Sequence, residues 1–195
     1  MSSKENIQNV ALKLFLTKGY NVGINEIIEQ ANTSKGAFYH HFKSKEQLFM
    51  ETIDEYFFGF LDNLSFLDKP NLDFDEQILK LVKLVFTPMK KLKDIFKNGE
   101  QFNYLGVLSE YPKNDVLRQK SREHLNLFIN KLQEIIEQSQ QAGKIKGSID
   151  KKVLSFHISM LIDGSIVDAL TIFDNIYKAE KECIKAIKQL IGLIK

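Results

Sequence analysis

A short polar run near the N-terminus, Thr33-Ser34-Lys35-Gly36, has residue types that suit contact with double-stranded DNA. Ser34 is placed to cap a helix, and the free N–H groups and dipole of a helix N-terminus bind phosphate. Lys35 and Thr33 can reach a base edge, and Lys35 can also reach a phosphate. Gly36 lets a helix approach a duplex closely, at a cost of about 1 kcal/mol relative to Ala.

The flanking residues extend the same predicted surface. Ala37 is suited to touch a thymine methyl group, and Tyr39 and His40 combine a flat body with a polar tip that suits a phosphate. Lys45 lies in the first turn of the next predicted helix, where a phosphate would meet both charge and dipole. Asn25 is a candidate phosphate contact at the start of the preceding helix. Outside this context, the lysines would be ordinary solvated side chains.

The elements that must position these residues are predicted to be helices. Only 3 Pro and 10 Gly interrupt 195 residues, and apolar residues recur with the helical period. We therefore expect an all-α fold of about nine helices. Their expected ranges are about 7–18, 24–31, 35–41, 44–65, 73–98 with an interruption at Pro88, 101–110, 116–142, 153–173 and 179–194.

The order of residues in the first quarter of the chain closely resembles the N-terminal domain of the tetracycline-repressor (TetR) family. The resemblance covers about residues 5–50. It implies a three-helix DNA-binding domain, residues 1–47, joined by the fourth helix to a C-terminal regulatory domain, residues 48–195. The matching residues are Ile7, Ala11, Leu14, Phe15, Gly19, Tyr20, Ile27, Ala31, Ser34, Lys35, Gly36, Phe38, Tyr39, His40, His41, Phe42, Lys45, Glu46 and Leu48.

Two short segments depart from the family pattern. The loop Asn21-Val22-Gly23 is one residue shorter than usual and lacks a hydroxyl, although Gly23 can serve as an N-cap. The turn before Ser34 has Asn32 where the family usually has Gly. Because Asn tolerates the left-handed backbone conformation, we expect the turn to be preserved.

The resemblance also implies a ligand cavity and a dimer formed through the last two helices. Each candidate for lining the cavity also fits an ordinary core or surface position. His124 and His157 lack neighbours at metal-ligand spacing, so we expect no metal, and no cofactor is predicted. The candidate ligand-binding residues are Phe86, Met89, Phe102, Tyr104, His124, Phe128, His157, Met160 and Asp163.

Composition narrows the class of protein. A single cysteine, Cys183, excludes an internal disulfide, and the N-terminus lacks the pattern of a signal peptide. No run of about 18 uncharged apolar residues occurs, so we expect a cytoplasmic protein with no membrane span. The net charge is +2, and residues 1–50 hold six Lys, no Arg and four acidic residues, so this quarter carries the whole excess.

The sequence therefore predicts a DNA-binding transcriptional regulator, most simply a homodimeric repressor released from its operator by a small ligand. The alternative is a DNA-binding protein of the same fold that is controlled by a protein partner or acts architecturally. We expect no enzymatic activity, because no nucleophile elbow, phosphate loop or metal-ligand cluster is present in the sequence.

Overall fold

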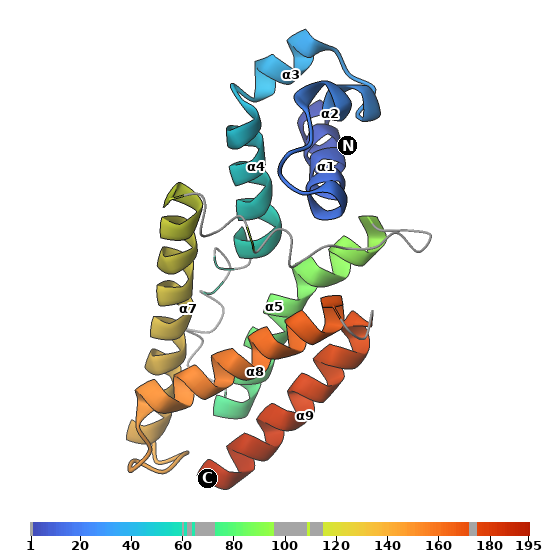
Figure 1. Cartoon of the computed structure of the whole chain (residues 1–195). Helices are drawn as coiled ribbons and strands as arrows, with labels where there is room; N and C mark the ends of the chain where they lie inside the picture. Colours follow the sequence, from blue (N-terminus) through green and yellow to red (C-terminus); the bar gives the residue numbers. More distant parts are fainter. Residues whose placement is uncertain are drawn as a thin grey trace. The chain divides into compact units, whose positions relative to one another are not determined.

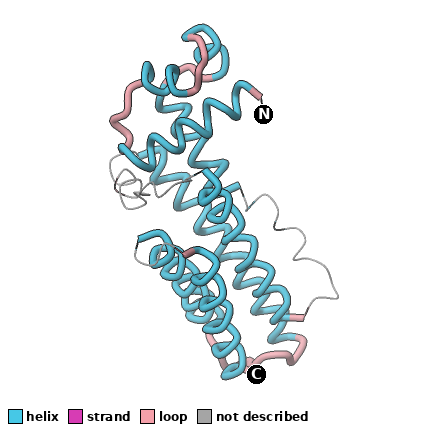
Figure 2. The backbone as a smooth tube through the Cα atoms, turned by 90° about the vertical axis from the view of Figure 1, so that its right-hand side faces the viewer, coloured by secondary structure: helices cyan, strands magenta, loops and turns pink. Residues whose placement is uncertain are grey.

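The chain folds into helices, as the computed structural model of residues 2–59, 61, 64, 73–95, 109, 115–171 and 175–195 shows. Throughout these described residues the regular elements are helical and no strand occurs (Figure 2). The prediction of an all-α fold is confirmed, with eight α-helices and one π-helical segment in the part described. Two compact units form, residues 1–59 with 91–119 and residues 60–90 with 120–195.

The first unit contains four short α-helices and the π-helical segment. Helix α1 begins in a complete capping box, in which Ser2 Oγ accepts from Glu5 N–H and Glu5 accepts from Ser2 N–H. Its other end is closed by Gly19, whose φ of +81° suits a glycine. The elements are α1 (Ser3–Lys18), α2 (Ile24–Gln30), α3 (Lys35–His41), α4 (Lys45–Ile53) and the π-helical η1 (Asp54–Phe58).

An aromatic core holds this unit together. The rings of Phe15 and Phe49 meet edge to face with centroids 5.0 Å apart, which joins α1 to α4. Phe38 and Phe42 are fully buried, and they anchor α3 and the residue that follows it. The three-helix N-terminal arrangement therefore depends on large aromatic side chains that are buried between the helices.

The second unit is built around α8 (Lys151–Thr171) and α9 (Ile176–Ile194), which lie side by side (Figure 1). Asp150 caps α8 through the N–H of Lys152, and Asn175 caps α9 through the N–H of Lys178. The same unit includes most of α5 (Phe74–Ile95) and of α7 (Asp115–Gln141). Pro88 lies inside α5, which continues through it to Ile95, so Pro88 does not divide the helix; the sequence predicted either a kink or a division there.

Helix α8 is apolar on two faces. One face is buried through Leu154, Ile158 and Ile162, while Phe156 and Met160 are exposed on another. By length and composition α8 could cross a membrane, with a mean hydropathy of 1.5, but a core helix of a soluble protein passes the same test. The buried apolar face of α8 packs against α9, whereas the apolar side chains of Phe156 and Met160 remain exposed.

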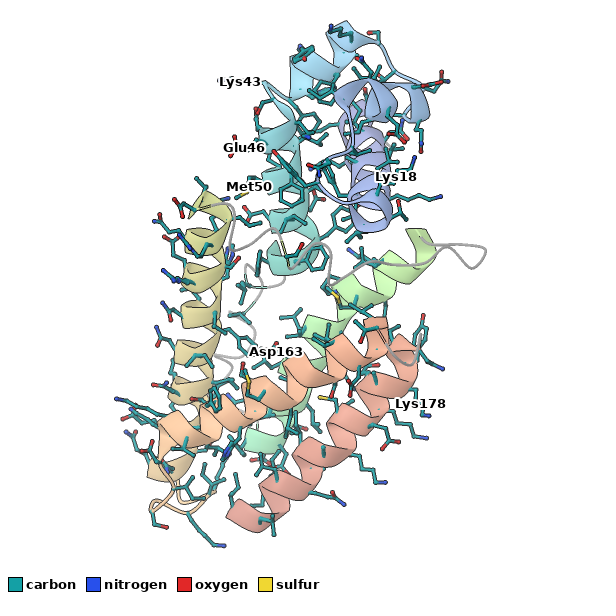
Figure 3. All side chains as sticks on the ribbon, viewed as in Figure 1. Lys18, Lys43, Glu46, Met50, Asp163 and Lys178 are labelled. Carbon is teal, nitrogen blue, oxygen red and sulfur yellow. The ribbon has the colours of Figure 1, made fainter. Side chains whose placement is uncertain are left out.

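Asp163 lies on α8 (Figure 3), where Ser159 Oγ donates to its carboxylate at 3.3 Å. Although Asp163 reaches solvent, burial among the helices raises the pKa of its carboxyl above the ordinary value of 3.8, and the Ser159 hydrogen bond only partly offsets this. Any stability that the carboxyl supplies is thus present in full below pH 3.8 and is lost as the pH rises through the raised folded pKa.

We therefore predict that Asp163→Asn raises the unfolding temperature at pH 7, on the order of 1–3 °C, because Asn keeps an acceptor for Ser159 and carries no charge. The gain should shrink as the pH falls and disappear at pH 3. Calorimetry or circular dichroism across this pH range measures it. A gain of equal size at pH 3 would contradict the electrostatic explanation.

A candidate DNA-binding surface on helix α3

Helices α2 and α3 are joined by the tight turn Ala31–Ser34. Asn32 has φ +47°, so the prediction that Asn adopts the left-handed conformation is confirmed. Thr33 N–H donates to Ile28 O and Asn32 N–H donates to Glu29 O, at 3.1 and 3.0 Å. These two bonds form a Schellman-type stop at the end of α2.

The turn is also tied to α1. Asn6 Nδ2 donates to the carbonyl of Ala31 at 2.7 Å, so that the end of α2 is fixed from a helix 25 residues away. Sequence reasoning missed Asn6, because nothing in a polar side chain beside Ile7 indicates which distant carbonyl it will meet. The bond orients the turn from which α3 begins.

Helix α3 begins as predicted, with Ser34 Oγ accepting from the N–H of Ala37 at 3.1 Å. Lys35, Gly36, Tyr39 and His40 are exposed, whereas Ala37 is half-buried. A Cβ added at Gly36 would meet only Ser34 Oγ, at an ordinary 3.8 Å. The domain itself therefore leaves room for a side chain at Gly36.

Two predicted contact residues lie beside α3 and not on it. Thr33 is half-buried in the turn, and Asn25 is exposed in the first turn of α2. Helix α2 is N-capped by Gly23, as expected, and the cap makes no side-chain hydrogen bond. Both residues belong to the segment formed by α2, the turn and α3, so they stay candidates for a DNA contact.

Lys45 has partners within the protein that the sequence did not indicate. Its ammonium donates to the carbonyl oxygens of Tyr20 at 2.9 Å and Val22 at 3.3 Å, and it lies 4.3 Å from the centre of the Tyr20 ring. Those groups belong to the loop between α1 and α2. The prediction of a phosphate contact considered only the charge of Lys45 and the dipole of α4. The loop carbonyls and the Tyr20 ring are further parts of its environment.

Other lysines of the unit are paired as well. Lys4 meets Glu51 at 2.8 Å and Lys18 meets Glu26 at 2.5 Å. Within the described residues, no ion pair involves Lys35, before Gly36, or Lys43, just after α3 (Figure 3). Lys35 and Lys43 thus lie at the two ends of α3, and Lys43 is a candidate that sequence reasoning missed.

The candidate ligand residues divide into three groups. Phe86, Met89 and Phe128 are buried, and His124 is half-buried. His157, Met160 and Asp163 are on the exposed side of α8. Phe102 and Tyr104 lie outside the described residues. No group of three or more potential metal ligands occurs among the residues that the structure describes.

Helices α2 and α3 are short and are joined by a four-residue turn, and the second helix has an exposed face. This arrangement is that of helix-turn-helix proteins. Residues 7–52 match the family model "Bacterial regulatory proteins, tetR family". This N-terminal region therefore matches the TetR family, and the resemblance seen in the sequence of these residues is confirmed.

The curated relatives agree mainly over the N-terminal region. The HTH-type transcriptional regulator QacR of Staphylococcus aureus is 44% identical over 55 residues, 28% of this chain and 29% of that protein. The negative transcriptional regulator IcaR of the biofilm operon icaADBC, from Staphylococcus epidermidis, is 30% identical over 116 residues, 51% of this chain and 63% of that protein. The matches thus span less than two thirds of these relatives' own length.

Solved structures resemble the whole chain in fold. A TetR transcription regulator from Haloarcula marismortui has a TM-score of 0.77 at 15% identity, covering 98% of this chain and 97% of that one. A protein from Saccharomonospora viridis, solved in complex with choline, has a TM-score of 0.72 at 21% identity, with 95% of each chain covered. The likeness shows a shared fold for the C-terminal part as well.

We predict that Ser34→Ala lowers the free energy of unfolding by about 1 kcal/mol, because the N–H of Ala37 loses its cap. Chemical denaturation measures the loss. Ser44→Ala is the matched control, because Ser44 Oγ caps α4 in the same way through the N–H of Gln47 at 3.0 Å. A similar loss of stability is expected for both variants, and an unchanged stability for Ser34→Ala would contradict the capping role.

Proposed function

We propose that the chain is a cytoplasmic, sequence-specific DNA-binding regulator of transcription, acting as a homodimeric repressor. The observation that carries the proposal is the exposed face of α3, where Gly36 is free of close neighbours and Lys35 and Lys43 lie at the two ends. A glycine within a helix lowers stability relative to Ala, and the domain does not need one at this position. Close approach of a duplex backbone supplies the reason for it.

In this proposal, different residues contact the DNA bases and the DNA phosphates. Since residues 1–50 hold no Arg, guanine recognition by paired Arg donors is absent from this region. Lys35 is the proposed base reader, assisted by Thr33 and Ala37, while Tyr39 and His40 contact phosphates. Asn25 and the capped N-terminus at Ser34 add phosphate contacts from the neighbouring elements.

We predict opposite effects of Gly36→Ala on stability and on DNA binding. The free protein should unfold at the same or a higher temperature, because Ala is the better helix former and meets no close neighbour. Affinity for operator DNA should fall about tenfold or more, because the methyl group separates helix from duplex. Fluorescence anisotropy and thermal unfolding measure the two quantities.

Gly147→Ala serves as the matched control, because Gly147 also lacks close neighbours and lies in the second unit. It should leave DNA affinity unchanged. If Gly36→Ala bound its operator as tightly as the unchanged protein, α3 would not approach DNA at this residue.

Lys35→Ala should weaken operator binding by about 1–3 kcal/mol and relax sequence preference at one position, because a base-edge contact is lost. Binding to random DNA should fall less. Anisotropy titrations with operator variants and with random duplex measure both. An equal loss on specific and random DNA would assign Lys35 to a phosphate instead.

The proposed dimer uses the outer face of α8. Val153, Phe156 and Met160 are 51%, 56% and 44% exposed, and they recur at intervals of three and four residues, as in a helix–helix seam. Leu193, on α9, is exposed as well. A second copy would cover this surplus, forming a four-helix bundle from the last two helices of each chain.

We predict that Phe156→Glu shifts the chain toward the monomer and weakens operator binding, since two half-sites must be held about 34–36 Å apart. Analytical ultracentrifugation measures the mass. Leu125→Glu, which changes a similarly exposed apolar residue on α7, is the matched control and should keep the native mass. Equal dissociation of both variants, or of neither, would place the dimer interface elsewhere.

Control by a small ligand is part of the proposal for the second unit. Buried Phe86, Met89 and Phe128 are the proposed apolar contacts, and half-buried His124 supplies a polar group. The choline complex of the Saccharomonospora viridis protein supports this form of control. A ligand that prefers the state with lower DNA affinity must itself be bound more weakly when DNA is present. Titration of extracted cellular metabolites against the DNA complex tests it.

The alternative is control by a protein partner. The exposed apolar face of α8 favours it only if the isolated chain is monomeric in solution, because that face would then remain uncovered. Sedimentation of the purified chain therefore separates the two possibilities.

A further inference from the structure

The ammonium of Lys45 occupies a socket formed by the α1–α2 loop. Two carbonyl oxygens, of Tyr20 and Val22, accept from Nζ at 2.9 and 3.3 Å, and the Tyr20 ring lies against the charge at 4.3 Å. The ring distance is well within the range of a cation–π interaction. An ammonium has three N–H donors, so this socket uses two of them.

The loop contains no helix of its own. It begins at Gly19, whose left-handed φ lets the chain turn away from α1, and it ends at Gly23, which caps α2 without a side-chain bond. The N–H of Val22 reaches Gly19 O at 3.5 Å, the outer limit of a hydrogen bond. Lys45 supplies charge-assisted hydrogen bonds to two carbonyls of this loop.

The aromatic ring beside the ammonium is itself fixed. Tyr20 packs at 4.8 Å, centroid to centroid, against Phe49, which lies on the same helix as Lys45. Helix α4 thus contacts the loop at two points, through the ammonium of Lys45 in its first turn and through the ring of Phe49 one turn later. Such a double contact sets the position at which α2 begins.

We propose that Lys45 is a positioning residue of the DNA-binding surface, a role that rests on the proposed function. Helix α2 follows the loop directly, and α3 follows α2 through the fixed Ala31–Ser34 turn. The Lys45 socket therefore places the helix pair relative to α4, which a phosphate contact alone would not do.

The test compares Lys45→Met with Lys43→Met in the full chain. Both variants remove one positive charge near α3, but only Lys45 has contacts with the loop. Amide hydrogen exchange is measured on the free protein, for Tyr20–Gly23 and for Ile27, whose N–H donates to Gly23 O at 3.2 Å. Affinity for operator and random DNA is then measured at several salt concentrations.

For Lys45→Met we expect exchange in the loop and at Ile27 to rise about tenfold, because hydrogen bonds to a charged donor are lost. Operator affinity should fall, affinity for random DNA should fall less, and the salt slope should stay the same. For Lys43→Met we expect unchanged exchange and, if it contacts a phosphate, a salt slope smaller by about one.

Lys45→Arg keeps the charge and replaces the compact ammonium with a planar fork. It should also raise exchange in the loop while keeping the salt slope, and it remains informative if Lys45→Met fails to fold. Unchanged exchange in both Lys45 variants, with a reduced slope for Lys45→Met, would overturn the positioning role. Absence of DNA binding by the unchanged protein would instead refute the proposed function. The exchange result would still show whether the Lys45 contacts hold the α1–α2 loop in place.

Discussion

The shortness of α3 is the constraint on which the rest of the N-terminal unit depends. A seven-residue helix has too few internal hydrogen bonds to persist in water by itself. Its stability comes from the burial of Phe38 and Phe42 against the other helices of the unit, and from the cap at Ser34. The exposed face of α3 can carry polar and small residues because its buried face supplies the stability.

The positioning of α3 is accordingly indirect, through bonds that join distant parts of the chain. Asn6 holds the turn before α3, and Lys45 holds the loop before α2. At the other end of α4, Gln8 donates to Glu55 at 3.0 Å and Tyr56 donates to Asn9, which fixes the π-helical segment to α1. Helices α1 and α4 thus pack against each other, and their side chains fix the segments that precede α2 and α3.

The second unit follows a different principle. Its helices α8 and α9 bury a common apolar seam, in which Cys183 is buried and burial raises the pKa of its thiol. The outer face of α8 remains apolar although the chain itself does not cover it. A helix with two apolar faces is expected where a second packing surface exists, and the proposed dimer would supply that surface.

Local patterns in the sequence determined the helices, the Ser34 cap, the left-handed Asn32 and the exposed residues of α3, because each depends on a few neighbouring residues and the helical period. The sequence left open whether Pro88 kinks or divides α5, and it did not predict the contact of Asn6 with Ala31 or the socket of Lys45. Those outcomes depend on which groups meet across 23 residues or more, or on packing that outweighs a local preference. Periodicity identifies the face that a residue occupies, and only the tertiary structure decides what lies opposite it.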